Sequence, residues 1–514
     1  MTATTSTDGR PGSAAQLDHV DMLIVGAGLT GIGAACRLAE LRPGSSFAIF
    51  EGRDAIGGTW DLFRYPGVRS DSDMFTLGYP FRPWPEARAI ADGPSIREYV
   101  RATAREFGVD QAIRFQHRVI SADWDSAAAR WMVTAEDGAT GDTVHVTCSW
   151  LSACTGYYRY DQGHRPAFPG QDRFPGTLVY PQSWPQDLDW TGKQIVVIGS
   201  GATAVTLVPS LAERAAHVTM LQRTPSYVLS LPGVDPMAKA LMRLLPDRLA
   251  HPIVRWKSAI VATLLYEFSQ RRPKAMRKLL RKGAVSALPE GYDVDVHFNP
   301  PYKPWDQRMC LIPDGDLYAS LSSGRAEVVT DRIATFTEHG IELASGRRLD
   351  ADIIVSATGL TLLALGGIQL RVDGNDVELP KTVLYKGMML SGVPNFNFVF
   401  GYTNNSWTLR ADLVNRYVIR LLAFMDRSGY DRAIPAAPAD EPADEPFLDL
   451  TSGYVQRGLG DLPRQGRRAP WRMHHNYLRD SYLMRRSPLE DEGMTFWRAT
   501  PQAKVAASER ALAG

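Results

Sequence analysis

Two glycine-rich turns, each set between an apolar strand and a helix, constrain what this 514-residue chain can fold into. The first turn follows the strand VDMLIV and contains Gly26, Gly28 and Gly31 in the pattern G-x-G-x-x-G. Glycines at these positions permit the tight turn, let a pyrophosphate approach the backbone and let the helix pack on its strand. The helix would offer free N–H groups to the phosphates. Residues 19–51 therefore predict one βαβ unit that binds a dinucleotide.

The end of the second strand in this unit carries an acid. Glu51 lies twenty residues after Gly31, where a carboxylate can accept hydrogen bonds from both ribose hydroxyls. A glycine turn without a ligand is the alternative, and it is disfavoured because strand, helix and acid are all in register. The motif by itself does not distinguish FAD from NAD.

The same pattern recurs in KQIVVIGSGATAVTLV, where Gly199, Gly201 and Ala204 form G-x-G-x-x-A. The following strand ends in MLQRTP, and Arg223 stands close to the place that Glu51 takes in the first unit. An acid there would repel a 2′-phosphate, whereas an arginine binds it with charge-assisted hydrogen bonds. The second unit therefore predicts an NADPH site, unless Arg223 is only a solvated surface arginine.

Composition removes several classes of function. Cys36, Cys148, Cys154 and Cys310 show no spacing typical of a redox disulfide, a zinc site or an iron–sulfur cluster, so we expect no metal. Hydride passed from NADPH to a flavin would then need oxygen, a quinone or an electron-transfer partner as its acceptor. The net charge of +1 gives no reason to expect nucleic acid. With no long apolar run and few cysteines, we expect a cytoplasmic protein.

The stretch GGTWDLFRYPGVRSD, residues 57–71, chooses among these acceptors. It matches [AG]-G-x-W-x-x-x-x-[FY]-P-[GM]-x-x-x-D at every fixed position, namely Gly57, Gly58, Trp60, Tyr65, Pro66, Gly67 and Asp71. The chain thus resembles the class B flavoprotein monooxygenases and, more narrowly, the Baeyer–Villiger monooxygenases. VVIGSGATAVTLVP, PWDQRMCLIPDGDL, DIIVSATGL and GYTNNSWTL extend the likeness to the ethionamide-activating subgroup, from about residue 20 to about residue 500.

The resemblance implies the roles of individual residues. Arg308 matches an arginine that stands over the flavin, and Asp71 matches the aspartate that pairs with it, so both are expected to be catalytic. A buried structural arginine is the alternative for Arg308. The expected cofactor-binding residues are Gly26, Gly28, Thr30, Gly31, Glu51, Gly58, Thr59, Trp60, Asp61, Leu62, Arg69, Asp71 and Val119 in the first unit, and Gly199, Ser200, Gly201, Ala202, Thr203, Ala204 and Arg223 in the second.

The expected fold is α/β, with two Rossmann-like dinucleotide-binding domains and a helical insert. The FAD domain would be interrupted by the NADP domain and so consist of two segments. The expected divisions are a disordered tail at 1–18, the first segment of the FAD domain at 19–165, the NADP domain at 166–345 with its insert at about 235–300, the second segment of the FAD domain at 346–430, and a C-terminal segment at 431–514.

The resemblance further implies the reaction. An FAD enzyme of this family uses NADPH and O₂ to form a C4a-peroxyflavin, which inserts oxygen into ketones to give esters or lactones and also oxygenates sulfides. The partners would then be a small ketone or sulfide and O₂, with the cofactors FAD and NADPH. Three alternatives stay open: a sulfur or nitrogen oxygenase with little ketone activity, an uncoupled NADPH oxidase, and a nucleotide-binding protein without turnover.

One fingerprint of the family is altered. FPGTLVYPQSWP keeps F-x-G-x-x-x-H-x-x-x-W-P except that Tyr180 stands where the histidine belongs. Tyrosine retains a ring and one hydroxyl, but it cannot become a cation near pH 7. We therefore expect flavin and NADPH binding to persist and the coupling of NADPH use to oxygen insertion to be in doubt. A neutral substitution in a linker is the alternative.

The segment RRPKAMRKLLRK, residues 271–282, carries seven basic residues and no acid. Met276, Leu279 and Leu280 have the spacing of one apolar helix face. This pattern raises weak peripheral membrane contact as a hypothesis, against a solvated face of the insert.

Overall fold

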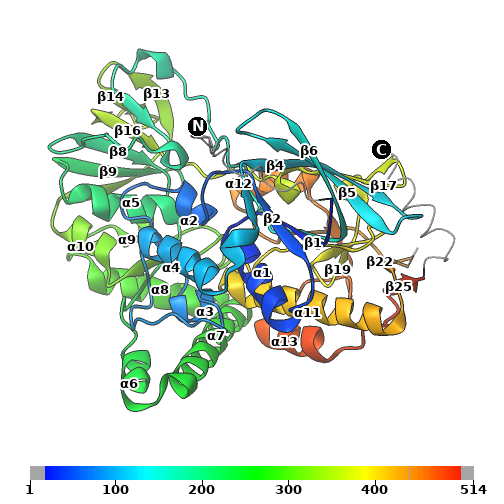
Figure 1. The fold of residues 1–514 in the computed structure, drawn as a ribbon. Helices are drawn as coiled ribbons and strands as arrows, with labels where there is room; N and C mark the ends of the chain where they lie inside the picture. Colours follow the sequence, from blue (N-terminus) through cyan, green and yellow to red (C-terminus); the bar gives the residue numbers. More distant parts are fainter. Residues whose placement is uncertain (1–17, 439, 499–514) are drawn as a thin grey trace, which may run out of the picture.

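The computed structural model describes residues 18–438 and 440–498, and two sheets in two adjoining lobes form its framework (Figure 1). We call the lobe of the first sheet the FAD-side lobe and the lobe of the second sheet the NADP-side lobe, after the cofactors that the sequence leads us to expect there. The tail expected at residues 1–18 lies outside the described residues, apart from Asp18.

The first sheet has the strand order β18-β17-β4-β5-β6-β1-β2-β3, and β21 also pairs with β6. β1 runs parallel to both β2 and β6, and β4, β5 and β6 are antiparallel. Its strands are β1 (His19–Val25), β2 (Phe47–Glu51), β3 (Ile113–Phe115), β4 (His117–Asp125), β5 (Arg130–Asp137), β6 (Thr143–Ala153), β17 (Gln369–Val372), β18 (Asn375–Asp376) and β21 (Phe396–Phe398). Leu23 and Ile24 are fully buried, as a parallel strand covered on both faces requires.

Helices from distant parts of the sequence cover one face of this sheet (Figure 1). α1 (Leu29–Leu41) packs against α11 (Trp407–Ser428), and α11 packs against α13 (Tyr477–Arg486). α4 (Gly93–Glu106) lies against α1. Arg37 of α1 pairs with Asp412 of α11 at 2.7 Å, so a buried ion pair also joins these two helices.

The second sheet is fully parallel, in the order β12-β9-β8-β16-β7. Its strands are β7 (Thr177–Val179), β8 (Gln194–Ile198), β9 (His217–Gln222), β12 (Ala326–Thr330) and β16 (Ile353–Ser356). α5 (Ala202–Ala212) and α10 (Asp316–Ser322) pack on it, and β13 (Ile333–Thr337), β14 (Gly340–Leu343) and β15 (Arg348–Asp350) form a small antiparallel sheet nearby.

The division expected at residue 346 is displaced. β16, at 353–356, pairs with β7 and β8 and therefore belongs to the second sheet. The chain rejoins the first sheet only at β17. Apolar strands that end in glycine look alike in sequence, so only strand pairing assigns β16 to its sheet.

Four helices fill the region of the expected insert: α6 (Pro236–Leu244), α7 (Asp247–Arg271), α8 (Pro273–Ala287) and α9 (Val294–His297). In α8, Met276 and Leu280 are buried in a small core, but Leu279 is exposed. The apolar face expected at 271–282 is thus turned inward. Within the described ranges, no helix combines the length and the apolar character needed to cross a membrane.

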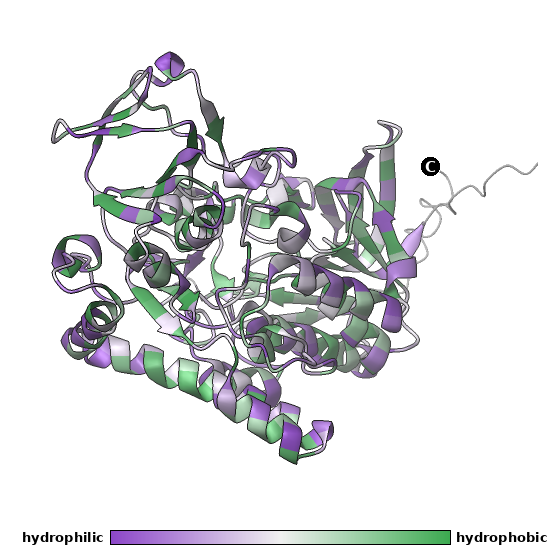
Figure 2. Ribbon diagram, turned by 90° about the vertical axis from the view of Figure 1, so that its left-hand side faces the viewer, coloured by the Kyte–Doolittle hydropathy of each residue, from purple (hydrophilic) through white to green (hydrophobic). Residues whose placement is uncertain are grey.

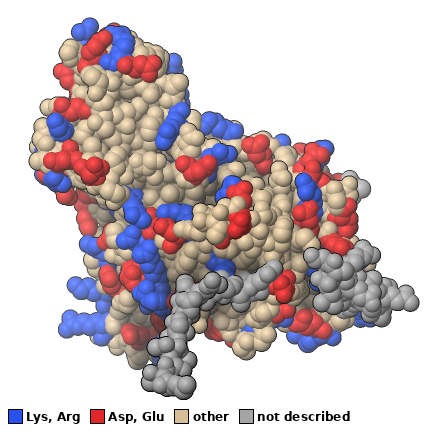
Figure 3. All heavy atoms as spheres, turned by 45° about the horizontal axis from the view of Figure 1, so that its top comes forward, with Lys and Arg blue, Asp and Glu red and all other residues tan. Residues whose placement is uncertain are grey.

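The shorter elements connect these layers. They are α2 (Thr59–Leu62), α3 (Met74–Leu77), β10 (Val228–Leu231), β11 (Cys310–Pro313), β19 (Leu384–Tyr385), β20 (Met389–Leu390), β22 (Arg432–Pro435), β23 (Glu445–Pro446), α12 (Gly453–Gly458), β24 (Arg464–Gln465) and β25 (Met494–Trp497), with short 3₁₀ turns at 109–112, 171–173, 181–183, 364–367, 379–381 and 459–461. Charges of both signs are mixed over the face seen in Figure 3, in keeping with a net charge near zero.

A buried ion pair holds the C-terminal segment on the FAD-side lobe. Arg410 of α11 donates to Asp480 of α13 at 2.6 Å, and both side chains are almost fully buried. Tyr402 donates to the same carboxylate. Since neither charge can be hydrated there, each depends on the other.

We expect Arg410→Leu to destabilise the protein by about 3–5 kcal/mol, because it leaves the Asp480 carboxylate buried without a cation. The measurement is the thermal unfolding midpoint by circular dichroism. Arg416→Ala is the matched control on the same helix: the Arg416 side chain is 42% exposed and pairs with Asp412 at 3.5 Å. Its loss should cost about 1 kcal/mol or less, because Asp412 keeps Arg37 as a partner. Equal shifts of the unfolding midpoint in the two variants would contradict the role given to the buried Arg410–Asp480 pair.

Candidate active site between the two lobes

The loop of residues 57–71 leaves the FAD-side lobe and lies against the NADP-side lobe. Gly67 has φ +75°, and a Cβ there would stand 1.9 Å from Oγ of Ser210 on α5, so no side chain fits. The Tyr65 hydroxyl is hydrogen-bonded to Thr203 at the start of the same helix. Burial raises the pKa of Tyr65 to about 12, and the phenol therefore stays protonated. The loop is thus a physical link between the lobes.

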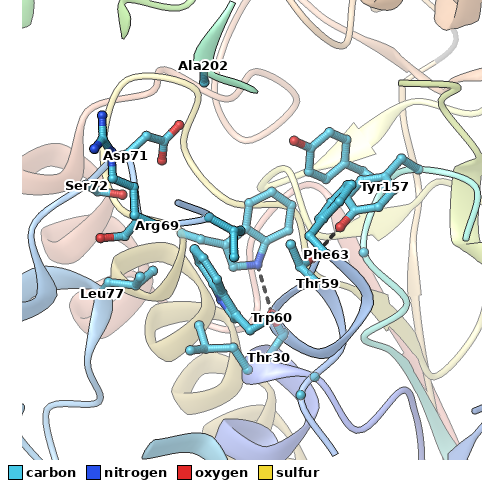
Figure 4. A pocket seen from close by; sticks show the side chains of 18 of the residues that line it. Thr30, Thr59, Trp60, Phe63, Arg69, Asp71, Ser72, Leu77, Tyr157 and Ala202 are labelled. Atoms are coloured by element: carbon cyan, nitrogen blue, oxygen red, sulfur yellow. Dashed lines mark hydrogen bonds between the residues drawn. The ribbon is translucent and has the colours of Figure 1, made fainter. Parts of the chain in front are cut away.

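A cavity opens where this loop meets both glycine turns (Figure 4). Its wall contains residues from the first turn, the linking loop, the second turn and the start of α11. The lining side chains and glycines are Gly28, Leu29, Thr30, Gly57, Thr59, Trp60, Phe63, Tyr65, Val68, Arg69, Ser70, Asp71, Ser72, Leu77, Cys154, Gly156, Tyr157, Tyr158, Tyr160, Ala202, Thr206, Arg308, Leu311, Tyr402, Asn405 and Trp407.

Arg308 and Asp71, 237 positions apart in the chain, meet on this wall. Nε of Arg308 lies 2.8 Å from Oδ2 of Asp71, and Nη2 donates to Oδ1 at 2.9 Å, so the contact is bidentate. About a third of each side chain is exposed. Burial lowers the pKa of Arg308, but the Asp71 carboxylate, with smaller contributions from Tyr157 and Tyr454, makes the net shift upward. The pair therefore presents a fixed cation to the cavity.

The first glycine turn forms a cradle that suits a pyrophosphate. Gly26 has φ +105°, and a Cβ on Gly31 would lie 1.8 Å from the Gly26 carbonyl oxygen. Gly28 is the N-cap residue of α1. Because glycine has no side chain, it does not cap the free N–H groups in the first turn of the helix. A helix start of this kind binds phosphate oxygens. The residues present therefore fit a dinucleotide.

Glu51 is held rigidly beside this turn. Its carboxylate accepts hydrogen bonds from the backbone N–H groups of Ala27, at 2.7 Å, and Arg53, at 2.9 Å. Burial raises the pKa of Glu51 although both bonds favour its anion. Each carboxylate oxygen can accept two hydrogen bonds, so capacity for ribose hydroxyls remains.

The second glycine turn is more open. Gly201 is the N-cap of α5 without a side-chain cap, and nothing lies within 4 Å of the place that its Cβ would take. The Ser200 hydroxyl instead donates to the Thr224 carbonyl at 2.9 Å. Arg223 follows β9 and is exposed, and it has no carboxylate partner in the part of the chain that the structure describes. A backbone cradle and a solvent-facing guanidinium thus lie on one edge of the second sheet.

Some of the expected cofactor-binding residues lie elsewhere. Asp61 is fully buried, and its carboxylate is paired with Arg53 at 2.8 Å and Arg101 at 3.0 Å, with two further arginines near it. Val119 packs in the core of the first sheet. Arg69 lines the cavity, but its guanidinium pairs with Asp316 of α10. The expected residues on the cavity wall are Gly28, Thr30, Thr59, Trp60, Arg69, Asp71, Ala202 and Arg308, whereas Gly26, Gly31, Glu51, Gly58, Asp61, Leu62, Val119, Gly199, Ser200, Gly201, Thr203, Ala204 and Arg223 are outside it.

Sequence reasoning missed the aromatic wall. Trp407, the first residue of α11, donates from Nε1 to the Thr30 hydroxyl at 2.8 Å, and the Tyr157 ring stacks on Trp407 with centroids 5.3 Å apart. Burial raises the pKa of Tyr157, so its phenol stays neutral. The motif GYTNNSWTL contains Tyr402, Asn405 and Trp407 and was the available signal, although nothing in it indicates which side chains face the cavity.

Tyr180 does not line the cavity, but it precedes the turn at 181–183, which contacts a residue of the cavity wall. The Arg165 guanidinium stands 4.9 Å from the centroid of the Tyr180 ring. Two residues later, Gln182 donates to the carbonyls of Arg159 and Tyr160, and Tyr160 lines the cavity. The substituted position therefore has a cation as its neighbour, which suits a tyrosine ring better than a charged imidazole.

Comparison with known proteins gives concordant matches. Residues 20–256 match the model of the flavin-binding monooxygenase-like family. The chain is 52% identical to the FAD-containing monooxygenase EthA of Mycobacterium tuberculosis over 480 residues, which covers 93% of this chain and 98% of that protein.

Solved structures share the fold. An oxidised steroid monooxygenase bound to NADP matches with a TM-score of 0.74 at 22% identity, over 93% of this chain and 100% of that one. The polycyclic ketone monooxygenase of the fungus Thermothelomyces thermophila matches with a TM-score of 0.75 at 18% identity, over 95% and 91%.

Proposed function

The chain belongs to the flavin-binding monooxygenase-like family and is a flavin monooxygenase, and we propose that it uses FAD, NADPH and O₂ to insert one oxygen atom into ketones. The family resemblance predicted from residues 57–71 is thereby confirmed. The overall reaction would convert ketone, O₂, NADPH and a proton to ester or lactone, NADP⁺ and water. Sulfides would be oxygenated in the same cavity. The observation that carries the proposal is the bidentate Arg308–Asp71 pair on the cavity wall.

Cofactor placement follows from the two glycine turns. The uncapped start of α1 would receive the FAD pyrophosphate, and Glu51 the ribose. The uncapped start of α5 would receive the NADPH pyrophosphate, and Arg223 the 2′-phosphate. When bound and reduced, the flavin supplies the electrons that activate O₂.

Arg308 supplies the electrostatic contribution to the reaction. Its guanidinium would donate to the carbonyl oxygen of a ketone and stabilise the negative charge that develops there. Preorganised donors of this kind contribute about 3–4 kcal/mol to the transition state. Asp71 aims the guanidinium and offsets its charge while no substrate is present. Oxygen transfer to a sulfide puts no charge on a carbonyl oxygen, so it should depend less on Arg308.

The first experiment tests this difference. We expect Arg308→Ala to lower ester formation by a factor of several hundred, with flavin bleaching by NADPH still measurable and sulfoxide formation less affected. Product is scored by gas chromatography with a phenyl ketone and a phenyl sulfide. Arg308→Lys is the control that keeps the positive charge but cannot form the bidentate contact with Asp71, and it should retain some of the ketone activity. An unchanged ester yield in Arg308→Ala would refute the role.

The second experiment concerns the nucleotide. Arg223→Ala should raise the KM for NADPH about tenfold to a hundredfold and leave the KM for NADH unchanged, because a charge-assisted hydrogen bond to the 2′-phosphate is lost. Arg214→Ala is the control, since Arg214 lies in the same lobe and pairs with Asp189 on the surface. Parallel changes for the two nucleotides would argue against a 2′-phosphate contact.

An uncoupled NADPH oxidase is a second candidate, because of Tyr180 and its neighbour Arg165. If a titratable ring is needed there, a histidine would supply it more fully when the adjacent cation is removed, since Arg165 disfavours imidazolium.

The third experiment separates this candidate from a neutral substitution. We expect Tyr180→His combined with Arg165→Gln to raise the ester formed per NADPH and to lower peroxide release, and Tyr180→His alone to do so less. Tyr180→Phe is the control that keeps the ring. The same product-to-peroxide ratio in all four proteins would mean that the tyrosine is neutral for coupling.

A further inference from the structure

One long helix of the insert exposes an unusually apolar surface. Along α7 (Asp247–Arg271), exposed apolar side chains recur every three or four residues: Leu249, Ile253, Trp256, Ile260, Leu264 and Phe268. Val261 and Leu264 are more than half exposed, at 56% and 60%. In Figure 2 the long helix at the lower edge of the molecule carries hydrophobic and hydrophilic bands along its length. A 25-residue helix is about 37 Å long.

The lysine, arginine and glutamate side chains between Leu249 and Phe268 each have a protein partner and are only partly exposed. Arg255 donates to the carbonyls of Phe75, Thr76 and Gly78 in and after α3. Lys257 pairs with Asp235, and Glu267 accepts from Asn476 and pairs with Arg271. The most exposed side chains between Leu249 and Phe268 are therefore apolar, whereas the charged side chains in this stretch are partly exposed and paired.

α13 extends this surface and makes it basic. Tyr477 packs on Trp256 with ring centroids 5.5 Å apart, which places α13 beside α7. α13 exposes Leu478 and Tyr482, together with Arg479, Arg485 and Arg486. Among the described residues, no carboxylate pairs with any of these three arginines, and the acid of α13, Asp480, is buried.

More cations stand at the two ends of α7. Arg243 and Arg248 are exposed near its start, and Arg272, Lys274 and Lys278 are exposed just beyond its end. Of the residues that the structure describes in α7 and α13, Asp247 is the one exposed acid. The whole chain has a net charge of only +1, so this concentration is local.

Charge decides between the occupants that such a face could have. If α7 packed on α7 of a second copy, the basic rims of both copies would be brought together, and like charges repel. Anionic lipid headgroups complement the rim, and the apolar face suits the boundary between headgroups and acyl chains. An amphipathic helix with a basic rim lies in the plane of a membrane surface and does not cross it.

We propose that α7 and α13 form a membrane-docking surface that binds anionic lipid headgroups, with α7 lying along the bilayer surface. The docking is independent of the proposed reaction. It differs from the contact expected at 271–282, because Met276 and Leu280 of α8 are buried in a small core, whereas α7 exposes a row of apolar side chains along its length.

The surface is also close to the cavity through packed side chains. Trp256 contacts Tyr477, and Tyr477 contacts Tyr402, which lines the cavity. On its inner side, α7 is joined through Arg255 to α3, whose last residue, Leu77, also lines the cavity. If the proposed function holds, apolar ketones or sulfides dissolved in lipid would lie near the site.

The test is flotation of the flavin-loaded full chain with vesicles. We expect it to float with vesicles of phosphatidylcholine and phosphatidylglycerol and to remain below with phosphatidylcholine alone. Salt should weaken the binding, since the headgroup attraction is screened. Failure to float with the anionic vesicles, or equal flotation with both kinds, would overturn the proposal.

Two double variants locate the surface. Arg485→Gln with Arg486→Gln should reduce partitioning about twenty-fivefold, because each arginine near the surface contributes roughly fivefold. Ile260→Ser with Leu264→Ser should reduce it similarly by removing buried apolar area. The matched controls are Arg348→Gln and Met132→Ser, which change an exposed arginine on β15 and an exposed methionine on β5, and should bind as the wild type.

Two further measurements keep the outcomes distinct. Flavin absorbance and turnover of a water-soluble ketone should be unchanged in all variants, so a failure of docking and a failure of the proposed reaction can be told apart. Light scattering should show no change of oligomeric state in the Ile260/Leu264 variant. An oligomer that this variant dissociates, without vesicle binding by the wild type, would assign the face to a second copy and overturn the proposal.

Discussion

The bidentate ion pair between Arg308 and Asp71 is the interaction on which the geometry of the cavity depends. Asp71 ends the loop that leaves the FAD-side lobe, and Arg308 precedes β11, which packs with the NADP-side lobe. Because a guanidinium and a carboxylate form two parallel hydrogen bonds only when their planes align, the pair fixes both side chains in direction as well as in position. With about a third of each side chain exposed, some of the charge remains available to whatever enters the cavity.

The rest of that loop explains why its sequence is so restricted. Gly57 forms a backbone bridge with Gly28 of the first turn. Tyr65 reaches Thr203, and Gly67 lies where a Cβ would collide with Ser210. This stretch of fifteen residues thus contacts the first glycine turn, the start of α5 and Arg308 in turn. Four fixed positions of the fingerprint, Gly57, Tyr65, Gly67 and Asp71, each make a separate contact. Together these contacts hold the two proposed cofactor sites in one arrangement.

The helical insert connects this interior to the outside. In α7, Arg255 reaches inward and donates to three carbonyls in and after α3, whereas a row of apolar side chains is exposed. This is the reverse of the usual surface helix, which turns its apolar stripe toward the core. Hydration of an exposed apolar face is unfavourable, and contact with a partner surface would remove this cost. The basic rim indicates that the partner surface is anionic.

The sequence by itself determined the two strand–glycine–helix units, Glu51, Arg223 and the family resemblance, because these features depend on local geometry and on residues near one another in the chain. Only the tertiary structure decided which strand belongs to which sheet, as β16 illustrates, and which side chains meet, as Arg308 does with Asp71 and Trp407 with Thr30. It also decided that Asp61 is engaged by arginines and that the exposed apolar face belongs to α7 and not to residues 271–282. Periodicity shows that a helix has an apolar side, but whether that side is covered depends on packing with segments hundreds of residues away.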